Sequence, residues 1–174
     1  MKTLIVIDMQ NDFIDGALGT PEAQAIVPKV KKKIEEYRER GDKIIFTMDT
    51  HHAGYLNTLE GQKLPVKHCI SGTDGWRLTS KLGSLSADDS ILAKYSFGYS
   101  CWDEGYYGFE DTESITLVGL CTDICVISNA LILKANFPET EITVDASCCA
   151  GTTPENHRAA LQVMKRCQIN VVGE

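Results

Sequence analysis

The chain has 174 residues, of which 43% are hydrophobic, 24% charged and 7% aromatic. This composition is typical of a globular protein, excludes disordered and fibrous classes, and offers no apolar run long enough to span a membrane. The formal net charge of −7 would repel a nucleic-acid backbone, so a small neutral or cationic molecule is the expected partner. The length predicts a single domain over residues 1–174.

Seven cysteines form an odd set in a chain that begins with an apolar segment and shows no secretory signal. This combination is typical of reduced cysteines in the cytoplasm. We therefore predict a cytoplasmic protein with free thiols and without a disulfide framework.

Six short runs rich in β-branched and aliphatic residues predict buried strands. They occur at fairly regular intervals, except for one long gap after the second run. The runs are Leu4–Ile7, Lys43–Phe46, Ile91–Ala93, Ile115–Val118, Ile142–Val144 and Ile169–Val172.

Helical periodicity fills several of the gaps between these runs. The first pattern covers Pro28–Arg40, because its apolar side chains share one face and Pro28 suits a first turn. Another pattern begins at Thr153 and Pro154 and leads directly into the last strand. The apolar stripe of this last helix is predicted to contain Ala160, Val163, Met164 and Cys167.

A helix over Asp123–Ala135 is apolar nearly all round and is therefore expected to be buried. Thr122 or Asp123 is available to cap its N-terminus. The alternation of strands and helices predicts a doubly wound α/β fold, in which a six-stranded parallel sheet lies between two layers of helices.

The segment from about residue 49 to residue 89 interrupts this alternation. It contains five glycines and little periodicity. So long an insertion in a compact domain is more often a functional loop than a simple connection. The insertion is therefore expected to carry ligand-binding residues.

Three chemically reactive side chains follow predicted strands. Asp8 follows the first strand, Lys94 follows the third, and Cys125 lies in the first turn after the fourth. The ligand crevice of an open parallel sheet lies outside the carboxyl ends of its strands, so these residues could meet there. A cysteine at a helix N-terminus near an ammonium is expected to favour the thiolate.

Each of these residues also has an ordinary interpretation. Asp8 alone could cap a turn, Lys94 alone could be a surface lysine, and Cys125 alone could be a small buried hydrophobe. Spacing by itself does not choose between these interpretations and a catalytic group.

Three segments resemble the signature segments of the nicotinamidase and isochorismatase type of cysteine hydrolases. They are residues 8–13 (DMQNDF), 94–97 (KYSF) and 119–126 (GLCTDICV). They occur in the order and spacing of that superfamily, and the resemblance spans nearly the whole chain. It implies the isochorismatase-like hydrolase fold, consistent with the doubly wound sheet expected from the strand and helix patterns.

The resemblance also assigns roles to particular residues. Asp8 would be the general base and later the general acid, Lys94 would hold the charges in place, and Cys125 would be the nucleophile. A cis peptide is expected between Leu120 and Cys121. The backbone N–H groups of Cys121 and Cys125 would form the oxyanion hole.

The insertion contains residues that resemble the metal ligands of nicotinamidases. Asp49 and His51 resemble the metal pair of the family, and Glu60 and His68 resemble the ligands that complete the site. Such nitrogen and oxygen donors suit one divalent ion, with Zn first and Mn or Fe(II) as alternatives. The other interpretation is that they are polar loop residues.

Two residues are predicted to contact the substrate. Phe13 resembles the aromatic residue that packs against the ring in nicotinamidases, although a place in the core is the alternative. Leu64 begins the segment LPVK before His68, where nicotinamidases usually carry an aromatic residue. This departure from the family pattern leaves the preferred ring open.

The leading hypothesis is a metal-assisted amidase that releases ammonia from nicotinamide or a similar small carboxamide through a cysteine thioester, within NAD salvage. The resemblance also makes a homo-oligomer the expected assembly. Within enzymes, the alternative is a metal-independent isochorismatase-like or carbamoyl-type hydrolase. From another class, the alternative is a non-catalytic α/β module that binds a ligand.

Overall fold

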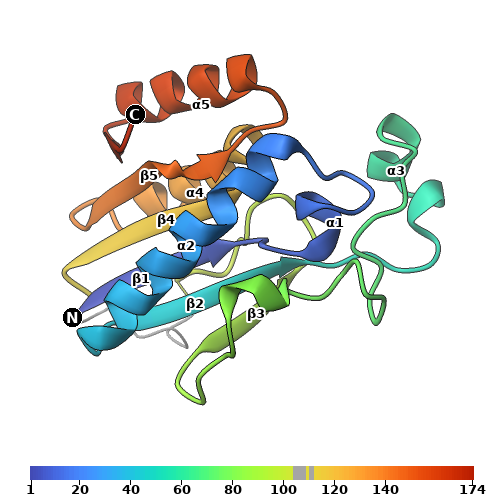
Figure 1. Cartoon of the computed structure of the whole chain (residues 1–174). Coiled ribbons are helices and arrows are strands. Elements are labelled where there is room, and N and C mark those ends of the chain that lie inside the picture. Colours follow the sequence, from blue (N-terminus) through green and yellow to red (C-terminus); the bar gives the residue numbers. More distant parts are fainter. Residues whose placement is uncertain (104–108, 110–111) are drawn as a thin grey trace.

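The computed structural model describes residues 1–103, 109 and 112–174, and its centre is a six-stranded sheet. The strand order is β3-β2-β1-β4-β5-β6, and every neighbouring pair is parallel (Figure 1). This confirms the predicted parallel sheet. The strands are β1 (Lys2–Ile7), β2 (Lys43–Asp49), β3 (Ser90–Lys94), β4 (Ser114–Leu120), β5 (Glu141–Ala150) and β6 (Asn170–Val172).

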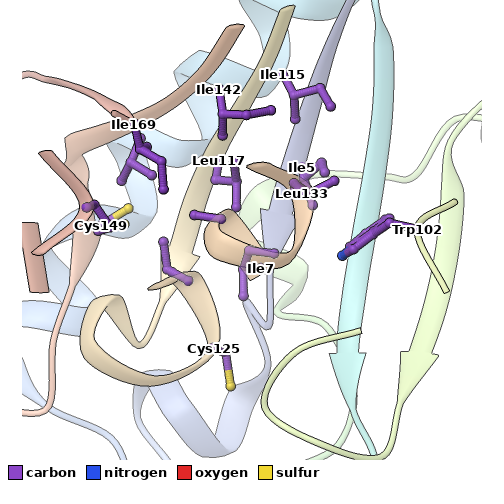
Figure 2. Packing of buried hydrophobic residues seen from close by; sticks show 14 of the residues in the cluster. Ile5, Ile7, Trp102, Ile115, Leu117, Cys125, Leu133, Ile142, Cys149 and Ile169 are labelled. Atoms are coloured by element: carbon purple, nitrogen blue, oxygen red, sulfur yellow. The ribbon is translucent and has the colours of Figure 1, made fainter. Parts of the chain in front are cut away.

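Helices cover both faces of the sheet, because successive strand residues point to opposite sides. On one face, α2 (Pro21–Glu39) packs against a cluster that contains Leu4 and Val6. On the other face, α4 (Ile127–Asn136) and α5 (Pro154–Arg166) pack against a cluster that contains Ile5 and Ile7 (Figures 1 and 2). The fold is therefore the predicted three-layer α/β arrangement.

The structure corrects the start of the first predicted helix, which is Pro21 rather than Pro28. The Thr20 hydroxyl accepts a hydrogen bond from Ala23 N, so Thr20 caps the helix and Pro21 is its first residue. The helix continues through Pro28 even though this residue lacks an N–H donor. Burial of the apolar face, which includes Ile26, offsets that missing bond.

The second predicted helix also begins differently. Residues Thr122–Val126 form a π-helical turn before α4, and the N-cap residue is Cys121, without a side-chain cap. The Thr122 hydroxyl instead lies 2.8 Å from His157 Nδ1, and Asp123 accepts two hydrogen bonds from the loop before α5. The capping prediction was wrong because tertiary partners take both side chains.

The last helix begins as predicted, with Pro154 in its first turn and Thr153 accepting a hydrogen bond from Asn156 N. Its packing face differs from the predicted stripe, because Val163 is 48% exposed and Cys167 is also exposed. The buried face consists of Ala160, Leu161 and Met164.

The long insertion extends beyond the carboxyl ends of β1 and β2 and then runs back along the edge of the sheet to the start of β3 (Figure 1). Asp49 is the last residue of β2 rather than a loop residue, and residues 50–89 contain only short helices. These are a 3₁₀ turn (Tyr55–Asn57), α3 (Leu59–Lys63) and a second 3₁₀ turn (Ser80–Leu82). Another short helix, α1 (Asn11–Ile14), follows β1.

The order of the strands reverses between β1 and β4, which is where parallel sheets bind ligands. Gly119 near the end of β4 has a φ of 118°, and a Cβ there would lie 2.1 Å from the Ile7 carbonyl oxygen. Only glycine allows this approach. It brings the end of β4 against the end of β1, next to Asp8.

Among the described residues, no helix has both the length and the apolar character needed to cross a membrane.

An ion pair joins α2 to β5. Lys33 Nζ lies 2.9 Å from Asp145 Oδ2, and the Ser147 N–H and hydroxyl donate to Asp145 Oδ1. Burial acts to raise the pKa of Asp145, but the hydrogen bonds from Lys33 and Ser147 outweigh it, so the pKa is lowered. A lowered carboxyl pKa stabilises the fold above the unfolded-state pKa, and this contribution is lost as the pH falls through the folded-state pKa.

We expect Asp145→Asn to lower the free energy of unfolding at neutral pH by about 1.5–3 kcal/mol, the range for hydrogen bonds to a charged group. The difference from wild type should shrink once the pH falls below the unfolded-state pKa of about 3.9. Urea unfolding at a series of pH values measures it, with the exposed Asp88→Asn as control. A difference that persists undiminished in acid would contradict the assignment.

Candidate active site

Asp8, Lys94 and Cys125 meet at the carboxyl ends of the strands. Lys94 Nζ lies 2.7 Å from Asp8 Oδ2 and 3.3 Å from Cys125 Sγ. All three residues are buried, with exposed fractions of 0% for Asp8, 1% for Lys94 and 4% for Cys125. Figure 2 shows the Cys125 sulfur at the end of the core cluster, pointing away from Ile7.

The backbone and a buried hydroxyl fix the Asp8 carboxylate. Asp8 has a φ of 47°, a left-handed conformation that aspartate tolerates better than most residues. Its N–H donates to Thr47 Oγ1 at 3.2 Å, and the same hydroxyl donates to Asp8 Oδ1 at 2.7 Å. Burial raises the pKa of Asp8, against the opposing effect of Lys94.

Lys94 links two acidic groups and the thiol. Besides Asp8 and Cys125, its ammonium contacts Asp49 Oδ1 at 3.3 Å and donates to the Ser96 carbonyl at 3.2 Å. Burial alone would lower the pKa of Lys94, but Asp8, Cys125 and Asp49 raise it well above its ordinary value. The ammonium therefore stays charged, because it neutralises the buried carboxylates around it.

The structure corrects the expectation that Cys125 rests as a thiolate. Burial raises the pKa of Cys125 well above its ordinary value, and the nearby Asp8 carboxylate raises it further. Lys94 acts in the opposite direction but does not prevail. A thiol with a raised pKa needs a base when it attacks, and Asp8 can provide one.

The predicted cis peptide between Leu120 and Cys121 is confirmed. It joins the end of β4 to the π-helical turn that carries Cys125. Within this turn, the Cys121 carbonyl accepts hydrogen bonds from the N–H groups of Ile124 and Val126.

Side chains able to bind a metal gather beside this group. Asp49, His51 and His68 each offer a ligand atom, and these atoms lie within 4.8 Å of one another. Glu60 Oε1 lies 3.5 Å from His51 Nε2 and 3.8 Å from His68 Nε2. The structure thus brings together all four residues that the sequence singled out.

The orientation of the two imidazoles suits metal binding. His68 Nδ1 lies 2.8 Å from the Val66 carbonyl, which leaves His68 Nε2 directed towards the cluster. His51 Nε2 is buried, lies 2.9 Å from Asp49 Oδ2, and makes no well-formed hydrogen bond with any described residue. A site that combines two carboxylates with a buried imidazole nitrogen lacking a hydrogen-bond partner in the described part of the chain fits a divalent cation.

A pocket of about 450 Å³ opens onto both groups. Its walls include Cys125 and Cys121 as well as Asp49, Glu60 and His68. Phe13 and Leu64, the two residues predicted to contact substrate, also line it. A small ring-bearing molecule could therefore contact the thiol and the metal cluster at once.

Sequence inspection missed two supporting residues. The Thr47 hydroxyl hydrogen-bonds Asp8. The Gln10 side-chain amide fixes the end of β2, because it donates to the Asp49 carbonyl at 2.9 Å and accepts from Asp49 N at 2.7 Å. Both are fully buried polar side chains. A threonine inside the apolar strand around Phe46 was the one available signal for Thr47.

The sheet topology and the position of the site define the class of this protein: it is a doubly wound α/β protein with a cysteine at the switch point of its parallel sheet. More particularly, the chain belongs to the isochorismatase family, because the model of the Isochorismatase domain matches residues 2–173.

Its relatives include named amidases. The nicotinamidase/pyrazinamidase of Mycobacterium tuberculosis is 26% identical, covering 99% of this chain and 98% of the relative. An Arabidopsis thaliana protein named as a probable inactive nicotinamidase is 30% identical, covering 93% of this chain and 87% of the relative. The solved structure of the pyrazinamidase of Pyrococcus horikoshii in complex with zinc has a TM-score of 0.85 and 27% identity over 99% of each chain.

Proposed function

We propose that this protein is a metal-assisted cysteine amidase that hydrolyses nicotinamide, or a similar small carboxamide, to the acid and ammonia. One observation carries the proposal. Cys125 lines the same pocket as Asp49, Glu60 and His68, and Lys94 contacts both Cys125 and Asp49. A substrate could thus be held by one group while the other attacks its carbonyl carbon.

In the first half-reaction, Cys125 Sγ forms a bond to the carbonyl carbon and passes its proton to Asp8. The carbonyl electrons move to the oxygen, which the backbone N–H groups of Cys121 and Cys125 would stabilise. When the carbon–nitrogen bond breaks, Asp8 returns the proton and ammonia leaves. A thioester remains on Cys125.

In the second half-reaction, Asp8 takes a proton from water as the water oxygen attacks the thioester. The carbon–sulfur bond then breaks, the sulfur regains a proton from Asp8, and the acid leaves. Throughout, Lys94 keeps a positive charge against Asp8 and against the negative charge that develops on the sulfur. Each step leaves the same net charge on the set formed by Asp8, Lys94, Cys125 and the bound substrate.

Asp49, His51, Glu60 and His68 are the residues that would hold the metal. A bound divalent ion supplies a Lewis acid that can bind a ring nitrogen and orient the carboxamide over the sulfur. Two nearby side chains, Phe13 and Leu64, form apolar walls for the ring. Leu64 offers a smaller and more flexible wall than an aromatic side chain would.

Ammonia release from a panel of carboxamides, with nicotinamide first, tests the proposed function directly. We expect turnover by the metal-loaded protein and a loss of at least about 100-fold after chelation, since the metal supplies orientation. Nicotinamide as the substrate would assign the enzyme to NAD salvage. No ammonia from any carboxamide would refute the proposal.

The metal site has its own prediction. His51→Ala should lose bound zinc, because the variant removes a buried nitrogen ligand, whereas the neighbouring exposed His52 provides a matched control as His52→Ala. Zinc content per chain, measured by atomic emission after dialysis, gives the result without any assay of activity. Equal zinc in the two variants would contradict the assignment of His51.

The alternative of a metal-independent hydrolase predicts that chelation leaves turnover unchanged. The alternative of a binding module predicts no turnover at all, and the relative named as probably inactive makes it worth testing. The chemical arrangement of Asp8, Lys94 and Cys125 favours the enzyme, because a binding module gains nothing from a buried ammonium that contacts both a carboxylate and a thiol.

A further inference from the structure

Asn129 is a fully buried amide on α4, one helical turn after Cys125. Its Nδ2 donates to the Cys125 carbonyl at 2.8 Å and to the Phe97 carbonyl at 3.2 Å. Its Oδ1 accepts from Tyr99 N at 2.9 Å and from Trp102 Nε1 at 3.0 Å. The side chain therefore uses two donors and two acceptor positions, which is the full capacity of an amide.

These bonds connect the cysteine turn with the segment that follows β3. That segment carries Phe97, whose side chain is 47% exposed and lines the pocket. Gly98 lies against α4, since a Cβ there would be 2.4 Å from Ile132 Cδ1. Trp102 anchors the far end of the segment in the core (Figure 2).

Asn129 itself does not line the pocket, so any effect on substrate must pass through Phe97 or Cys125. We propose that Asn129 is a positioning residue that fixes the Phe97 wall and the Cys125 turn relative to each other. This inference rests on the proposed function for its kinetic test. The role requires an amide, because no other side chain of this size donates twice and accepts twice.

Two substitutions separate the two halves of this role. Asn129→Thr keeps a donor for the Cys125 carbonyl, because a helical threonine can bond the carbonyl four residues before it, but it releases the Phe97 segment. Asn129→Asp keeps an acceptor for Tyr99 N and Trp102 Nε1, but it removes both donors.

We expect Asn129→Thr to raise KM about five- to tenfold with kcat within about twofold, the effect of one or two lost hydrogen bonds. Asn129→Asp should lower kcat about tenfold as well, because the Cys125 carbonyl also loses its donor. Equal changes in kcat for the two variants would overturn the proposal, since a purely structural role predicts that both variants change KM and kcat in the same way.

A double-mutant cycle tests the route through Phe97. Phe97→Ala should raise KM, and adding Asn129→Thr to it should cause little further change, because the wall that Asn129 positions is already gone. Additive effects on KM would overturn the proposal. Thermal unfolding of each variant establishes that the compared proteins are folded.

A measurement independent of turnover separates this inference from the proposed function. Cys125 is alkylated with iodoacetamide or with its bulkier N-benzyl derivative, and peptide mass spectrometry follows each rate. Asn129→Thr should change the ratio of the two rates about fivefold, since only the benzyl group reaches the Phe97 wall. An unchanged ratio overturns the inference, whereas a wild type that releases no ammonia refutes the proposed function alone.

Discussion

Replacing Cys125 with alanine is expected to lower kcat by about 10⁵-fold or more, the scale seen when a covalent nucleophile is removed from a hydrolase. The reason is direct, because Lys94 Nζ contacts the Cys125 sulfur at 3.3 Å and also holds the Asp8 carboxylate at 2.7 Å. Ammonia release under saturating carboxamide measures the effect. The metal content should not change, since Cys125 is not among the metal-binding residues.

The matched control is Cys167→Ala, which removes an exposed thiol after α5. This control should keep wild-type turnover and wild-type stability. A Cys125→Ala protein whose kcat lies within about tenfold of wild type would exclude covalent catalysis by this residue.

Asp8→Asn is the second change with a very large expected effect. The amide has the same shape and can still accept from the Thr47 hydroxyl, but it cannot take the proton of the Cys125 thiol. Because the pKa of Cys125 is raised by burial and by Asp8, its proton needs an acceptor, and we expect kcat to fall about 10³-fold, within the range for loss of a general base. Steady-state ammonia release measures the loss.

The control for Asp8→Asn is Asp15→Asn, which changes an exposed aspartate paired with Lys81. Asp8→Asn combined with Cys125→Ala should be no slower than Cys125→Ala alone, because the two residues act in one step. Fully additive losses would mean that Asp8 works in a step that does not involve the thiol.

The sheet could be predicted from the sequence because its strands are short, apolar and separated by turn signals. The first residues and the packing faces of the helices were harder to predict. Pro21 and Pro28 both fit a helix start, and the helix begins at Pro21, where Thr20 caps it and the residues around Ile26 pack against the sheet. Similarly, Val163 fits an apolar stripe in the sequence but faces solvent, because the face of α5 that packs against the sheet carries Ala160, Leu161 and Met164.

The principal site residues could be identified because their motifs are local, whereas their electrostatics depend on distant neighbours. The sequence put Cys125 at a helix start and favoured the thiolate. Burial and the Asp8 carboxylate reverse that direction, and neither is visible in residues 119–126. The same limit explains Asn129, whose partners Phe97 and Trp102 are about 30 residues away in the chain.

The four candidate metal ligands show what a motif can and cannot provide. Asp49 and His51 are almost adjacent in sequence, but their convergence with His68 depends on the path of the insertion. Asp12 helps to fix this path by accepting from Cys69 N at 2.8 Å, and Gln10 fixes the strand end at Asp49. Neither link follows from spacing alone.

The most direct measurement is the stoichiometry of inactivation by iodoacetamide, with each modified cysteine mapped by mass spectrometry. Loss of ammonia release should follow the modified fraction of Cys125 in a one-to-one relation, and a bound carboxamide should slow both. Full turnover from protein in which Cys125 is completely alkylated would contradict the account.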